Sequence, residues 1–149
     1  MGGLAAMLCA MAFGLVLVAL VGGVILRAAC ALFNKFVSDP AARVAEPNFL
    51  PAAGIVIAAA LVNMVVGFTV GFVIGAGFGP DNLQAAQYVS SAIALPLSIL
   101  VMAALLSAML PTTFLRGLAI AGLYLLIALA IVTVIAILVF VVVFALSAV

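Results

Sequence analysis

Apolar side chains fill four long stretches of this chain, and polar or turn-forming residues separate them. The stretches cover residues 4–26, 52–76, 88–110 and 115–146. A helix of about 20 apolar residues crosses the hydrocarbon core of a bilayer, so each stretch predicts a transmembrane helix. We therefore predict an all-α integral membrane protein, a bundle of four transmembrane helices that forms one domain over residues 1–149.

Turn-forming and capping residues mark the limits of the predicted helices. The first helix is expected to continue past Arg27 until Ser38, Asp39 and Pro40 end it, because proline disfavours a helical residue before it. Asn48 suits the start of the second helix as a polar cap. A turn is expected across residues 77–82, where glycine, proline, aspartate and asparagine gather.

The fourth apolar stretch is longer than a bilayer requires. Its run of about 32 residues measures about 48 Å as a helix, against a hydrocarbon core of about 30 Å. The later part is rich in β-branched residues, but a single open strand cannot cross lipid with its backbone unpaired, so we predict helix. We expect this helix to tilt or protrude and to face lipid along most of its length.

The composition agrees with a membrane location. The chain is 72% hydrophobic and 5% charged, whereas a soluble domain needs about a quarter charged residues. We therefore expect a multi-pass integral protein, placed in a bacterial cytoplasmic membrane, with membrane lipids among its partners.

The basic residues predict the orientation. Arg27, Lys35 and Arg43 fall in the first connection and Arg116 in the third, so all four lie on one side of the membrane. The positive-inside tendency makes that side cytoplasmic and places both termini outside. The connection over residues 27–51 is then cytoplasmic, and the first helix extends past the bilayer on that side. The four basic side chains are expected to act as interfacial anchors that touch anionic lipid headgroups.

Glycine recurs at every fourth position in the second span. Gly67, Gly71, Gly75 and Gly79 follow Asn63 at the same spacing, which places all five residues on one helix face. Small residues let two backbones approach closely in lipid, so this glycine stripe predicts a helix-packing groove of the glycine-zipper kind. Its occupant is another span of the same chain or a helix of another chain. Small residues that can face it within the chain are Ala10, Gly14 and Gly22 or Gly23 in the first span and Ser91, Ala94 and Ser98 in the third.

Two residues within the spans have both a structural and a functional interpretation. Asn63 is the only strongly polar side chain deep in a span, so it either forms a hydrogen bond to another helix or lines a pore or ligand site. Pro96 interrupts the third span and predicts a kink, because it removes one backbone hydrogen bond. Ser98 beside it keeps open the alternative of a gate.

The sequence offers no constellation of catalytic or metal-binding residues. Histidine is absent, and no charged residue lies in the middle of a span, which argues against proton relays and ion-coupled transport. The acidic residues are Asp39, Glu46 and Asp81, and the last is expected across the membrane from the others. We therefore expect no enzyme, no metal, no cofactor and no nucleic-acid partner.

Two function classes remain. The first is a structural or accessory membrane subunit that packs through its glycine-lined helix face, in a homo-oligomer or in a larger complex. The second is a small homo-oligomeric channel or pore lined by polar groups near Asn63. The first class fits better, because a pore needs polar groups through the whole depth of the membrane.

Overall fold

The computed structural model describes residues 2–78 and 82–147, in which every regular element is a helix and no strand occurs. The elements are α1 (Gly2–Phe36), a short 3-10 helix η1 (Pro40–Ala42), α2 (Phe49–Phe78), α3 (Leu83–Met109) and α4 (Phe114–Ser147). All four α-helices are long and apolar enough to cross a membrane. This confirms the prediction of an all-helical chain with four candidate spans and suggests a multi-pass membrane protein.

The helices are longer than the predicted spans because an apolar stretch measures the hydrocarbon core rather than the whole helix. α1 continues through Arg27 to Phe36 and ends just before Ser38, Asp39 and Pro40, as the sequence predicts. α2 begins at Phe49, and the Ala52 amide donates to the Asn48 carbonyl at 3.0 Å. The turn predicted across residues 77–82 includes residues 79–81, which lie outside the described ranges.

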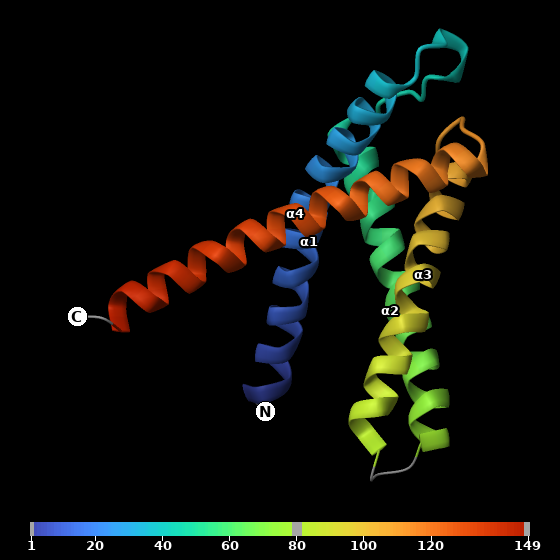
Figure 1. Ribbon diagram of the computed structural model, residues 1–149. Coiled ribbons are helices and arrows are strands. Elements are labelled where there is room, and N and C mark those ends of the chain that lie inside the picture. Colours follow the sequence, from blue (N-terminus) through green and yellow to red (C-terminus); the bar gives the residue numbers. More distant parts are fainter. Residues whose placement is uncertain (1, 79–81, 148–149) are drawn as a thin grey trace.

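Each helix packs against two others, in a closed order. α1 contacts α2 and α4, and α3 contacts α2 and α4. α2 and α3 run side by side in opposite directions, and α4 crosses them toward α1 (Figure 1). The α1–α2 connection and the α3–α4 loop lie at the same end of the molecule (Figure 1). This arrangement is consistent with a membrane helical bundle.

The core contains one almost fully buried large side chain from each helix. Leu26, Leu106 and Ile120 are 0% exposed and Ile55 is 1% exposed. Lipid tails are as apolar as these side chains, so their contribution comes mainly from close packing and dispersion contacts rather than from removal from water. Val44 of the α1–α2 connection also belongs to the core, so the core lies in the half of the molecule that carries this connection.

The α1–α2 connection is tied to α1 by one asparagine. The Asn34 amide nitrogen donates to the Val44 carbonyl, and the Val44 amide donates to the Asn34 amide oxygen, both at 2.8 Å. Since both backbone groups of Val44 are paired, its side chain can enter the core, where it is 3% exposed. The Asp39 carboxylate accepts from the Ala41 amide at 2.9 Å and caps η1.

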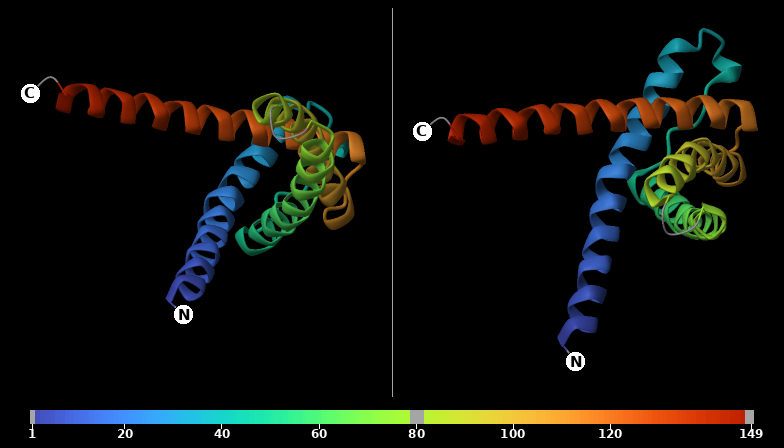
Figure 2. Two further views of the ribbon diagram at one scale, coloured as in Figure 1. Left: turned by 90° about the horizontal axis from the view of Figure 1, so that it is seen from below. Right: turned by 60° about the horizontal axis from the view of Figure 1, so that its bottom comes forward.

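Away from the core the helices separate. The first half of α1 and the later half of α4 diverge from the α2–α3 pair (Figure 2). Every residue of α4 from 129 to 147 is exposed. The later part of α4, which the sequence predicts to face lipid, thus has no side chain buried by the described part of this chain.

Candidate functional site

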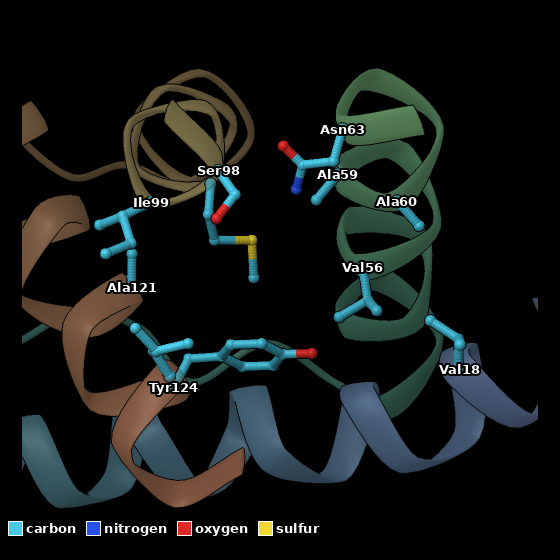
Figure 3. Close-up of a pocket in the computed structure, with 11 residues that line it drawn as sticks. Val18, Val56, Ala59, Ala60, Asn63, Ser98, Ile99, Ala121 and Tyr124 are labelled. Carbon is cyan, nitrogen blue, oxygen red and sulfur yellow. The ribbon is translucent and has the colours of Figure 1, made fainter. Parts of the chain in front are cut away.

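A cavity of about 210 Å³ lies beside the core, where all four helices contribute to its wall. Figure 3 shows it between α2 and α3, with α4 below. The lining residues are Val18 of α1, Val56, Ala59, Ala60 and Asn63 of α2, Ser98, Ile99 and Met102 of α3, and Ala121, Tyr124 and Leu125 of α4. Three of them are alanines, whose short side chains leave space that larger residues would fill. No charged side chain contributes to the wall.

Asn63 provides the amide group of this cavity. Its side chain projects from α2 toward α3 (Figure 3). The amide oxygen Oδ1 is buried and has no hydrogen-bond partner among the described residues. A buried polar atom without a partner costs about 1–3 kcal/mol. Asn63 is the one amide that the sequence places deep in a span, and its Oδ1 atom accepts no hydrogen bond from the described residues.

Ser98 of α3 faces the same space across from Asn63 (Figure 3). Its hydroxyl donates to the Leu95 carbonyl at 2.7 Å, so its oxygen remains available only as an acceptor. Pro96 lies within α3, and it has no N–H to donate to the Ala92 carbonyl. α3 nevertheless remains one helix from Leu83 to Met109.

Tyr124 of α4 closes the cavity on the side opposite Asn63 (Figure 3). Its hydroxyl oxygen lies over α1, 3.0 Å from the position that a Cβ atom would take on Gly22. A larger residue at position 22 would therefore collide with Val56, which lies at 2.6 Å, and with Tyr124, and both of these side chains line the cavity. The absence of a side chain at Gly22 helps to set the shape of this wall.

A second cavity of about 330 Å³ adjoins the first between α2 and α3. Its lining residues are Asn63, Val66, Gly67, Ser91, Ala94, Leu95 and Ser98. Asn63 and Ser98 therefore border both cavities. The sequence suggests Ser91, Ala94 and Ser98 as neighbours of the groove, and they do face its first section. Together with Gly67 they border a cavity, however, and they do not pack into the space that a side chain at Gly67 would occupy.

The rest of the glycine stripe has little near it within this chain. A Cβ atom placed on Gly67 or Gly75 would meet nothing within 4 Å, and one on Gly71 would meet only the Ser90 hydroxyl at 4.0 Å. Gly79 lies outside the described residues. The described part of the stripe thus has no helix of the same chain closely packed on it.

Three other glycines mark the close approaches between helices. A Cβ atom on Gly22 would lie 2.6 Å from Val56, one on Gly23 would lie 3.3 Å from the Ala53 backbone nitrogen, and one on Gly117 would lie 2.8 Å from the Ala103 carbonyl oxygen. The sequence pointed to Gly22 and Gly23 as possible packing residues but missed Gly117. The signal available was the spacing of Gly117 and Ala121, two small residues four apart on α4.

The four predicted anchors differ in their surroundings. Arg27, Lys35 and Arg43 are exposed. Arg116 is half-buried, and its guanidinium donates to the Ala41 carbonyl at 3.4 Å, which joins the start of α4 to η1. Their contact with lipid headgroups remains a prediction.

The described residues contain no group of three or more histidine, cysteine, aspartate or glutamate side chains that could hold a metal ion. Asp39 and Glu46 both lie in the α1–α2 connection, away from the cavity. We compared the chain with protein-family models, with curated proteins and with solved structures, and no match was found. A functional assignment therefore has to come from the cavity and from the uncovered helix faces.

Proposed function

We propose that this chain is a non-enzymatic accessory subunit of a membrane assembly, which packs against further copies of itself or against a different subunit. The observation that carries the proposal is the later part of α4. Residues 129–147 are exposed and project away from the core (Figure 2). They form an apolar rod of about 28 Å at 1.5 Å per residue, close to the thickness of a hydrocarbon core.

This part of α4 presents almost no free polar group. The Thr133 hydroxyl donates to the Leu129 carbonyl and the Ser147 hydroxyl donates to the Phe144 carbonyl, both at 2.8 Å. The Phe140 and Phe144 rings stack on the surface with their centroids 6.3 Å apart. Such a surface suits lipid and apolar helices, and it offers nothing for chemistry on a polar substrate.

The glycine stripe on α2 is the second surface that supports the proposal. Gly67, Gly71 and Gly75 leave a backbone surface that another helix can approach closely. Phe68 and Phe72 stack beside it, with ring centroids 6.5 Å apart, and can pack on the flank of an incoming helix. In this proposal the stripe acts as a glycine zipper between chains.

Native mass spectrometry of the protein, extracted gently from its membrane, tests this assignment. We expect particles that contain several copies or a defined second chain. Particles of one chain that carries only lipid would contradict it.

We also propose an orientation with both termini outside, in a bacterial cytoplasmic membrane. The support is that the α1–α2 connection, which carries Arg43, and the α3–α4 loop, which Arg116 follows closely, lie at one end of the molecule (Figure 1). The hydrogen bond from Arg116 to the Ala41 carbonyl joins them. In this orientation α1 extends past the bilayer on the cytoplasmic side, so that Lys35 and Arg43 reach lipid headgroups there.

A small homo-oligomeric pore is the alternative. The observation in its favour is that Asn63 and Ser98 border two adjoining cavities. It predicts flux of ions or small solutes through liposomes that contain only this protein. Absence of flux for several solutes and membrane potentials would exclude the pore and leave the subunit proposal standing.

A further inference from the structure

We propose that the 210 Å³ cavity is a binding site for a small, neutral, mainly apolar molecule with one hydroxyl group, about the size of a phenol. The hydroxyl forms its hydrogen bond with Asn63. This inference goes beyond the subunit proposal, because it assigns a ligand to the interior of one chain.

The size of the cavity sets the size of the ligand. An apolar protein cavity of about 150 Å³ binds benzene. At about 210 Å³, this cavity has room for one aromatic ring and a short substituent. Most of its wall is alanine, valine, isoleucine, leucine and methionine side chains, and no charged group is present to neutralise an ion. The ligand is therefore neutral and largely apolar.

The polar groups of the wall set the position of the hydroxyl. Asn63 Oδ1 is buried without a partner and needs a donor. The Ser98 oxygen, whose proton is directed to the Leu95 carbonyl, can also only accept. A ligand that carries only acceptors would leave Asn63 Oδ1 unpaired. A hydroxyl both donates and accepts, so it complements the whole amide group.

The second cavity supplies a path from the hydrocarbon. It lies between α2 and α3 and shares Asn63 and Ser98 with the binding cavity. Gly67 and Ala94 keep its walls short of side-chain atoms. A molecule dissolved in the membrane can pass between the two helices and meet the Asn63 amide at the boundary of the two cavities.

Fluorine NMR on the protein in detergent micelles tests the proposal with two probes, 4-fluorophenol and fluorobenzene. In wild-type protein both probes should give a saturable signal that empty micelles lack. Asn63→Leu should weaken the binding of 4-fluorophenol by about three- to thirty-fold, the ratio of dissociation constants expected for one hydrogen bond inside a membrane protein. The same variant should leave fluorobenzene unchanged within about twofold, which separates loss of the hydrogen bond from loss of the cavity.

A space-filling variant provides the second arm. Ala60→Phe should abolish binding of both probes, because Ala60 lines the cavity. Ala76→Phe is the matched control, since Ala76 lies on the same helix, is exposed and does not line the cavity, so both probes should still bind. Circular dichroism checks that each variant keeps its helices. Two results would overturn the proposal: no saturable signal in wild-type protein, or equal 4-fluorophenol binding in wild type and Asn63→Leu.

Discussion

Gly117 of α4 lies directly against the backbone of Ala103 in α3, so that a Cβ atom at position 117 would come within 2.8 Å of the Ala103 carbonyl oxygen. Real Cβ atoms do not approach a backbone oxygen this closely. Both residues are buried, and the fully buried Leu106 and Ile120 lie beside them in the same helices. The crossing of α3 and α4 therefore depends on the absence of a side chain at one position.

Gly117→Ala is expected to destabilise the fold by about 1–3 kcal/mol, because the added methyl group forces two backbones apart. Gly122→Ala is the matched control on the same helix, since a Cβ there would meet nothing within 4 Å. The control should leave stability unchanged or raise it by up to about 1 kcal/mol, the helix preference of alanine over glycine. Thermal unfolding in detergent, followed by circular dichroism, measures both variants. Equal melting temperatures would show that α3 and α4 do not cross at Gly117.

Gly75→Leu is expected to reduce association between chains while the fold of one chain stays intact. A side chain at Gly75 finds open space within the chain but blocks close approach by another helix. Gly54→Leu is the control, because Gly54 is an exposed glycine on the same helix, also with nothing within 4 Å of a Cβ, and it lies outside the stripe. Native mass spectrometry should report fewer copies or a lost partner for Gly75→Leu alone. Unchanged particle mass in both variants would count against the stripe as an interface.

Asn34→Ala is expected to cost about 1–3 kcal/mol, because it leaves the paired N–H and C=O groups of Val44 without their partner. It should also increase proteolysis within the α1–α2 connection, since Val44 in that connection then loses its link to α1. Ser38→Ala serves as the comparison in the same connection, where the Ser38 side chain is exposed. Limited proteolysis and thermal unfolding measure the difference. If the two variants behave alike, Asn34 does not hold the connection.

The proposed orientation predicts which positions an impermeant thiol reagent can reach. In a chain with Cys9→Ala and Cys30→Ala, a cysteine at Asn82 should react from outside intact cells, and one at Ser38 should react only after the cells are opened. Both positions are exposed, so burial does not prevent labelling at either one. The reverse pattern would mean that the protein has the opposite orientation in the membrane. Labelling of both positions from outside would argue against an odd number of spans between them.

The sequence predicts the helices well because the length of an apolar run is a local property. The continuation of α1 past Arg27 to Phe36 followed from the position of Pro40. The later part of α4 was expected to face lipid because it is rich in β-branched apolar residues and has no stripe of small ones, and that expectation remains a prediction. Asn63 was singled out because no other amide lies deep in a span, and its Oδ1 atom is buried at the cavity wall.

The packing partners could not be predicted in the same way. A stripe of glycines shows that a face can accept a helix, but which helices meet depends on how all four cross. The close contacts fall instead at Gly22, Gly23 and Gly117. The cavity was equally hidden, because Ala59, Ser98 and Tyr124 come from three helices and share no local pattern.

The later part of α4 also has a mechanical consequence. Ile127 is the last residue of α4 that packs against the core, and Ser147 lies 20 residues further along the same helix. At 1.5 Å per residue this segment is about 30 Å long, so a rotation of about 10° of the helix about Ile127 displaces its tip by about 5 Å. Small changes in the packing around Gly117 and Tyr124 would thus move a subunit bound at the tip. Tension on the tip would in turn displace residues of α4 in the cavity wall.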